Sequence, residues 1–129
     1  MKKRRMDERL IASLERELLS WPGVFKRYDA DGIGGLAVTG YRYGDPETGG
    51  PQLGHLHHDG VADLQFPREL REDLVRAGKA QPHRGGFRAV VSYRIGSEKD
   101  IPGAVSLFRL SYGIIAGRED RKASRRVGA

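Results

Sequence analysis

At residues 54–64 the chain reads GHLHHDGVADL, and the predicted fold is built around this segment. Polar and apolar residues alternate over His55-Leu56-His57, as in a β-strand with one buried face, and a second segment with strand-forming residues follows Asp59-Gly60. An Asp-Gly pair between two such segments is a strong signal for a tight turn. We therefore predict a hairpin of two strands, Leu53–His57 and Val61–Phe66, joined at residues 58–60.

Three helices are predicted outside the hairpin. Apolar residues recur at helical spacing over about residues 7–20, and a Pro-Gly pair ends that helix. A second helix begins at Pro67, which suits a first turn, and is capped by Gly78. A third has an apolar face that runs from its cap at Asp100 to Gly117, where we expect it to end.

Three further strands are predicted at residues 24–28, 35–41 and 87–95, the last of which is rich in β-branched and aromatic side chains. The Gly- and Pro-rich stretches 43–52 and 82–86 are expected to be loops. The fold class that follows is a single α+β domain. Its sheet is mainly antiparallel with about five strands, and the N-terminal, middle and C-terminal helices pack on one side.

Length and composition bound the class of protein. A chain of 129 residues fits one domain with a real core. There is no cysteine, which excludes disulfides and thiolate sites. No apolar run approaches the roughly 20 residues that span a bilayer, and the basic N-terminus lacks the apolar segment of a secretory signal. We expect a cytoplasmic protein without a membrane partner.

The net charge of +6 belongs to the ends of the chain. Residues 2–5 are all basic, and residues 118–129 contain five basic and two acidic residues, so the remainder is close to neutral. We therefore divide the chain into a basic tail at 1–6, a domain at 7–117 and a charged flexible tail at 118–129. A nucleic-acid-binding protein needs a basic face on its folded domain, so we expect no nucleic-acid binding beyond weak contacts through the tails.

The hairpin carries the candidate catalytic residues. Strand alternation places His55 and His57 on one face, with Asp63 on the returning strand and His83 at the head of a later loop. Histidine titrates near neutrality, so the group can act as acid or base without a metal. Two histidines at i and i+2, with a third from elsewhere and a carboxylate from Asp59 or Asp63, can also bind zinc or iron. A structural role on the solvent-exposed face of the hairpin is a further alternative. Of these, we expect a site without metal.

Four other side chains are candidates for ligand binding. Asp59 lies in the turn, Ser92 and Arg94 lie on the strand at 87–95, and Tyr41 ends the strand at 35–41. Arg94 shares a strand face with Arg88 and can hold an anion with it, although a solvent-exposed strand face is the more common role of such residues.

These residues resemble a family. The motifs GHLH at 54–57, DG at 59–60, DL at 63–64 and PH at 82–83, with VSYRI at 91–95 and LFRLSY at 107–112, look like the small luciferase-domain family of short bacterial proteins, related by name to fungal luciferase. The resemblance covers roughly residues 8–112 and is most specific over 54–83. Members often carry a second histidine where this chain has Arg84.

The resemblance implies a function. Fungal luciferase oxidises a hydroxypyrone with molecular oxygen, without flavin or metal. The expected function is therefore the binding of a small aromatic or pyrone-like molecule, with a cofactor-independent oxygenase activity if the protein is an enzyme. In that reaction a histidine would remove a proton from an acidic enol. The alternative is a noncatalytic interaction module, such as a homodimer formed through the exposed sheet.

Overall fold

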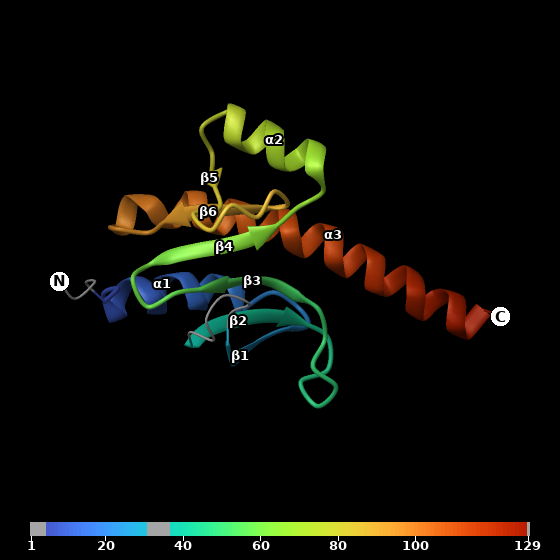
Figure 1. Cartoon of the computed structure of the whole chain (residues 1–129). Helices are drawn as coiled ribbons and strands as arrows, with labels where there is room; N and C mark the ends of the chain where they lie inside the picture. Colours follow the sequence, from blue (N-terminus) through green and yellow to red (C-terminus); the bar gives the residue numbers. More distant parts are fainter. Residues whose placement is uncertain (1–4, 31–36, 129) are drawn as a thin grey trace.

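The computed structural model describes residues 5–30 and 37–128, and Figure 1 shows helices packed against an open sheet. In chain order the elements are α1 (Glu8–Leu18), β1 (Val24–Ala30), β2 (Ala37–Tyr43), β3 (Gln52–Leu56), β4 (Val61–Gln65), α2 (Arg68–Arg76), β5 (Gln81–Pro82), β6 (Val90–Arg94), the 3-10 turn η1 (Glu98–Asp100) and α3 (Ile101–Gly128). The predicted α+β class with three helices is confirmed. The first two residues of the strand predicted at 35–41 lie outside the described residues.

The sheet has six strands in the order β1-β2-β3-β4-β6-β5, and every neighbouring pair is antiparallel. We predicted about five strands, and the additional one is β5, which contributes only two residues to one edge. Two residues are too few for a periodic pattern, and one of them is Pro82, although proline is rare in strands. The predicted hairpin is present, with Gly60 at φ +90° in its turn.

One face of the sheet is covered by α1 and α3, which contact each other. The apolar core lies between these helices and the sheet. Asp7 caps α1 by accepting a hydrogen bond from the Arg9 backbone N–H at 2.8 Å. Leu14 and Leu18 of α1 and Phe108 of α3 have no exposed surface. The middle helix adds Leu74 to the same core, so the domain has one continuous apolar interior.

The pairing of β2 with β3 contains a bulge that sets the faces of β3. Tyr41 lies opposite Gly54, but Arg42 lies opposite Gln52, so Leu53 is an extra residue on the β3 side. Its carbonyl accepts a hydrogen bond from the buried Ser111 hydroxyl at 2.7 Å. The bulge brings Gln52 to the same face as His55, three residues further on, where their side chains meet.

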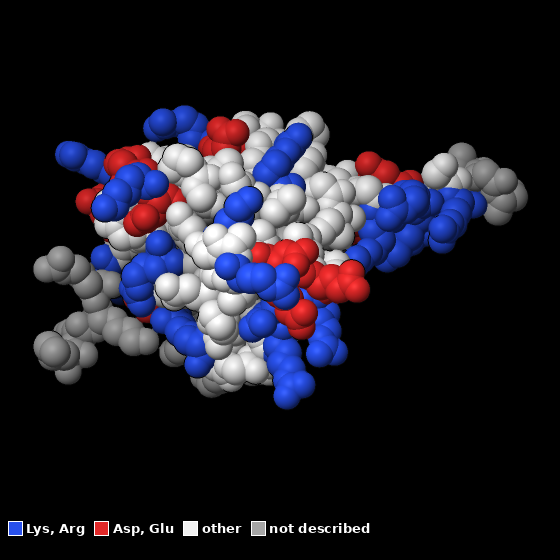
Figure 2. Space-filling view, turned by 90° about the horizontal axis from the view of Figure 1, so that it is seen from above, with Lys and Arg blue, Asp and Glu red and all other residues white. Residues whose placement is uncertain are grey.

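The third helix continues beyond the point at which we predicted its end. It does not end at Gly117 but runs to Gly128 and projects past the sheet (Figure 1). A single glycine costs a helix only about 1 kcal/mol, and the Glu119–Lys122 pair and the Tyr43–Asp120 hydrogen bond support the following turns. The predicted tail at 118–129 is thus helical up to residue 128, and Figure 2 shows its basic side chains gathered on the projecting end.

Among the described residues, no helix combines the length and the apolar character needed to cross a membrane.

Candidate functional site

The face of the sheet opposite α1 and α3, which we call the open face, carries a row of register partners. Gly40 pairs with His55, His55 with Asp63, and Asp63 with Ser92. Opposite residues in an antiparallel sheet point to the same side. The row therefore places a histidine, a carboxylate and a hydroxyl next to one another, and the missing side chain at Gly40 leaves space at its end.

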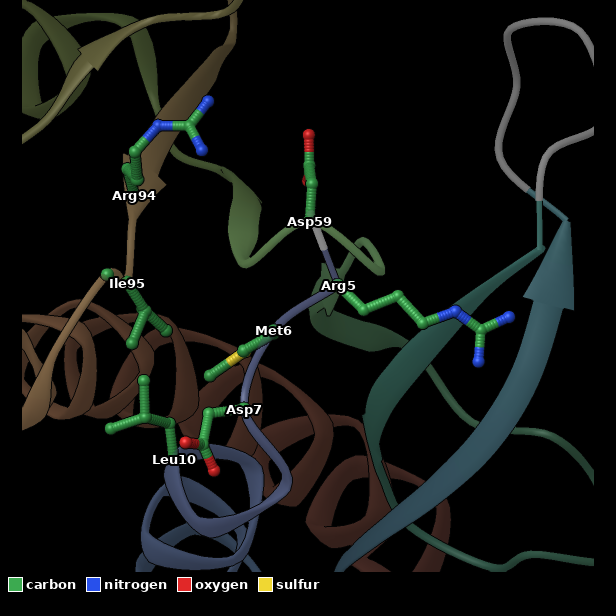
Figure 3. A pocket seen from close by; sticks show the side chains of 8 residues that line it. Arg5, Met6, Asp7, Leu10, Asp59, Arg94 and Ile95 are labelled. Atoms are coloured by element: carbon green, nitrogen blue, oxygen red, sulfur yellow. The ribbon is translucent and has the colours of Figure 1, made fainter. Parts of the chain in front are cut away.

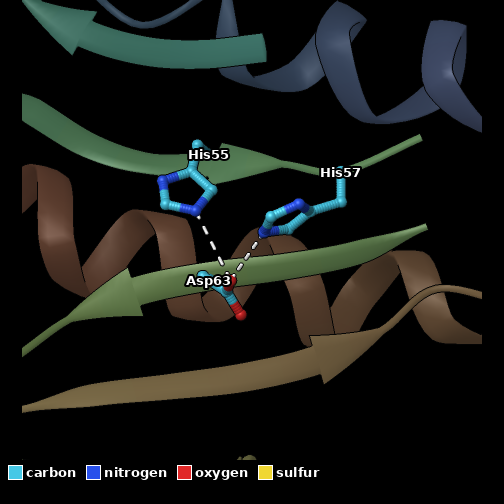
Figure 4. Close-up of side chains that lie close together, drawn as sticks. All are labelled: His55, His57 and Asp63. Atoms are coloured by element: carbon cyan, nitrogen blue, oxygen red, sulfur yellow. Dashed lines mark hydrogen bonds and ion pairs between the residues drawn. The ribbon is translucent and has the colours of Figure 1, made fainter. Parts of the chain in front are cut away.

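Asp63 is the centre of this site. Its Oδ2 atom lies 2.8 Å from Nε2 of His57, and 3.4 Å from Nε2 of both His55 and His83. Its Oδ1 atom accepts a 2.6 Å hydrogen bond from the Ser92 hydroxyl. We call these five residues the Asp63 cluster, and Figure 4 shows the rings of His55 and His57 turned toward Asp63 on the near side of the strands.

The carboxylate of Asp63 is almost completely enclosed, with 1% of its side chain exposed. Burial by itself raises a carboxyl pKa, but the hydrogen bonds from His55, His57 and Ser92 outweigh that effect and hold the pKa of Asp63 well below its usual range. The side chain of Asp63 is therefore ionised at neutral pH, and the cluster contains a buried negative charge.

Two of the histidines are oriented through their second ring nitrogen. The backbone N–H of Gly85 donates to Nδ1 of His83 at 2.9 Å, so the proton of a neutral His83 is on Nε2, which faces Asp63. Nδ1 of His55 lies 3.0 Å from Oε1 of Gln52. These contacts fix the direction in which each ring presents Nε2.

Gly40 is needed for the Gln52 contact. A Cβ atom at position 40 would come within 2.9 Å of Nε2 of Gln52 and still closer to Oδ2 of Asp29. The amide nitrogen of Gln52 and the carboxylate of Asp29 thus share the space above Gly40, which leaves the amide oxygen for His55.

The loop between β5 and β6 covers one side of the Asp63 cluster. His83 is only 7% exposed in its side chain, and its ring packs at 5.2 Å against Phe87, which is exposed. Arg84 forms an ion pair of 2.8 Å with Oδ2 of Asp59 in the β3–β4 turn. This pair fastens the loop that carries His83 to the hairpin that carries His57.

A cavity of about 660 Å³ lies beside the hairpin turn. Its charged lining includes Arg5, Asp7, Asp59 and Arg94, and Figure 3 shows the guanidinium groups of Arg5 and Arg94 on either side of Asp59. Neither arginine makes an ion pair with a carboxylate anywhere in residues 5–30 or 37–128. Two arginines of the lining can thus contact an anion, beside the carboxylates of Asp7 and Asp59.

The eight predicted site residues fall into three groups. The structure brings five together in the Asp63 cluster: His55, His57, Asp63, His83 and Ser92. Asp59 and Arg94 line the neighbouring cavity. Tyr41 lies on the opposite, helix-covered face, where it has no exposed surface and its hydroxyl donates to Oε2 of Glu15 at 2.9 Å.

Sequence reasoning did not find Gln52, Gly40 or Phe87. The signal for Gln52 is hidden, because only the bulge at Leu53 turns a residue three positions before His55 to the same face. Gly40 falls within a predicted strand, and an isolated glycine there is a known sign of close approach by a neighbouring group.

His55, His57 and Asp63 also meet a geometric condition for metal binding. Each offers one ligand atom, and the three atoms lie within 4.8 Å of one another.

Residues 50–111 match the family model described as the luciferase domain. This segment belongs to the luciferase-domain family. The resemblance noted in the sequence is thereby confirmed for the part of the chain that runs from just before β3 into α3. No curated protein and no solved structure matches the chain. All five residues of the Asp63 cluster lie inside the luciferase domain.

Proposed function

We propose that this protein binds a small acidic molecule, aromatic or pyrone-like, as its anion in the cavity next to the β3–β4 turn. The observation that carries the proposal is the presence of two arginines, Arg5 and Arg94, in the lining of this cavity. Ligand cavities of small molecules typically measure about 300–1,000 Å³, and this one has about 660 Å³.

The register of β4 and β6 links the cavity to the cluster. Arg94 pairs with Val61, and Ser92 pairs with Asp63, so Arg94 and Ser92 are two residues apart on the same face of β6. The backbones of Arg94 and Ser92 are therefore roughly 7 Å apart along β6. An aromatic ligand also finds the exposed ring of Phe87 next to His83.

The catalytic form of the proposal is an oxygen-dependent reaction of a bound enol. The enolate carbon forms a bond to O₂ and gives up two electrons, and one proton completes a hydroperoxide. Molecular oxygen from solution is the oxidant. The arginines stabilise the anionic form of the ligand, which is the electron-rich species that reacts.

Titration of the protein with 4-hydroxy-6-methyl-2-pyrone, followed by nuclear magnetic resonance, tests the binding. We expect saturable shifts at residues of the cavity and cluster. Replacing the charge in Arg94→Gln should weaken binding about tenfold or more, since a charged contact is worth about 1.5–3 kcal/mol. The matched control is Arg76→Gln on α2, which lies outside the cavity and should bind as the unmodified protein does.

Two results would count against the proposal. The first is the absence of saturable binding of both the pyrone and a simple aromatic carboxylate such as benzoate. The second is equal affinity in Arg94→Gln and Arg76→Gln. An oxygen electrode separates binding from catalysis, because a catalytic domain consumes oxygen only when the enol is present.

A further inference from the structure

We propose that His55, His57 and Asp63 bind a divalent transition-metal ion, and that His83 positions the Asp63 carboxylate for it. The inference goes beyond the proposed function, because the site holds an ion whether or not the cavity takes an organic ligand. It also departs from our expectation, drawn from the sequence and the family resemblance, of a site without metal.

The separations between the candidate ligand atoms match those around one ion. With bonds of about 2.0–2.2 Å, two ligand atoms on the same ion are about 3.0 Å apart at a right angle and about 3.4 Å apart at a tetrahedral angle. Oδ2 of Asp63 lies 2.8 Å from Nε2 of His57 and 3.4 Å from Nε2 of His55. All three atoms lie within 4.8 Å of one another.

The ligand atoms are supported by the outer contacts that metal sites use. A metal-bound histidine commonly donates its other ring N–H to an oxygen atom, and a metal-bound carboxylate commonly accepts further hydrogen bonds. Nδ1 of His55 meets the Gln52 amide oxygen at 3.0 Å. Ser92 occupies Oδ1 of Asp63 at 2.6 Å, which leaves Oδ2 as the metal-binding oxygen.

His83 has a different task from the two ligands. The Gly85 N–H holds Nδ1 of His83, so a neutral ring presents Nε2–H, a donor, to Oδ2 of Asp63. A nitrogen that carries a proton cannot bind a metal, but it can hold the carboxylate in place. His83 is therefore a positioning residue.

The donor set indicates the class of ion. Two imidazoles and one carboxylate suit Zn²⁺, Fe²⁺, Mn²⁺ or Co²⁺, whereas Mg²⁺ and Ca²⁺ prefer oxygen alone and Cu⁺ prefers sulfur. Three protein ligands leave at least one coordination position for water or another molecule, as in catalytic rather than structural zinc sites.

Metal analysis of the purified full chain, followed by chelator treatment and titration with Zn²⁺ or Co²⁺, tests the proposal. We expect one ion per chain, bound with micromolar or tighter affinity, and a visible Co²⁺ absorption band typical of four or five ligands. The cobalt spectrum of the unmodified protein decides the matter even if a variant fails to fold.

Variants then assign the roles. His57→Ala and Asp63→Asn should abolish stoichiometric binding, with folding checked by circular dichroism. The matched control is His58→Ala, because His58 is the neighbouring histidine and is exposed. His83→Ala should still bind one ion, but about 10–100-fold more weakly, as expected for a residue that supports a ligand.

The proposal is overturned if the unmodified chain shows no stoichiometric Zn²⁺ or Co²⁺ binding, or if His57→Ala and His58→Ala bind the ion equally well. Pyrone titration of the chelator-treated protein separates this outcome from failure of the proposed function. A chain that binds the pyrone but no metal contradicts only the metal site. A chain that binds the metal but neither the pyrone nor benzoate contradicts only the small-molecule proposal.

Discussion

The two faces of the sheet differ in how many partners surround a buried polar side chain. On the helix-covered face, the Tyr41 hydroxyl donates to Glu15, and the Tyr41 ring packs edge-on against Phe108 at 5.5 Å. On the open face, the carboxylate of Asp63 faces three imidazoles and one hydroxyl. Tyr41 has one partner for its one proton, whereas Asp63 gathers partners from two other strands and a loop.

This difference separates a structural polar group from a candidate functional one. A single hydrogen bond is enough to offset the burial of a hydroxyl. Several titratable groups around one carboxylate cost desolvation for each group, and a core of apolar side chains fills the same volume without that cost. The convergence on Asp63 therefore points to use in binding or chemistry, while the pairing of Tyr41 with Glu15 is accounted for by the fold alone.

The largest expected effect comes from removing the centre of the open-face cluster. Asp63→Ala leaves the imidazoles and Ser92 without their common partner, and we expect a loss of about 3–5 kcal/mol in the free energy of unfolding. Urea denaturation of chelator-treated protein measures it. A loss smaller than that caused by Tyr41→Phe would reverse the comparison between the two faces.

A smaller effect is expected on the covered face. Tyr41→Phe removes one hydrogen bond and keeps the ring against Phe108, and Glu15 retains its 3.0 Å ion pair with Lys26. The same urea experiment should show a loss of about 1 kcal/mol. Metal and pyrone binding should not change, since Tyr41 is on the other side of the sheet. Altered binding would show that the two faces are coupled.

The smallest effect is a dependence on alkaline pH. Burial, followed by the nearby Glu15 carboxylate, raises the pKa of Tyr41 well above its usual value. The native state therefore keeps a proton that the unfolded chain loses near pH 10. The stability from this group is complete below about pH 10 and declines as the pH rises further. Tyr41→Phe should decline less steeply, and identical slopes would contradict a buried, protonated Tyr41.

Much of the fold was predictable because the decisive signals are local. Strand alternation around Asp59-Gly60 requires only neighbouring residues, and it placed His55 and His57 correctly on one face. The pairing of His55 with Asp63 follows once the turn is known. Local signals also gave a wrong end for α3, because Gly117 resembles a helix terminus. The helix continues to Gly128, and its turn at Asp120 accepts a hydrogen bond from Tyr43, which is distant in the sequence.

The remaining parts of the site depend on contacts between distant segments. His83 reaches Asp63 because Arg84 holds the loop to Asp59, an ion pair across 25 sequence positions. Gln52 joins His55 because β2 and β3 shift register at Leu53. Neither arrangement leaves a periodic trace in the sequence, so composition and spacing cannot reveal them.

The short β5 strand also affects how the molecule meets its own copies. An exposed sheet edge is a template for another strand, and proteins protect such edges by shortness, proline and lysine. At one edge β5 offers two residues, and Pro82 has no N–H to donate. At the other, β1 presents seven residues that include Lys26 and Arg27. Addition of a strand from another copy is therefore limited to two residues at β5, whereas β1 offers seven, with Lys26 and Arg27 already paired with Glu15 and Asp29.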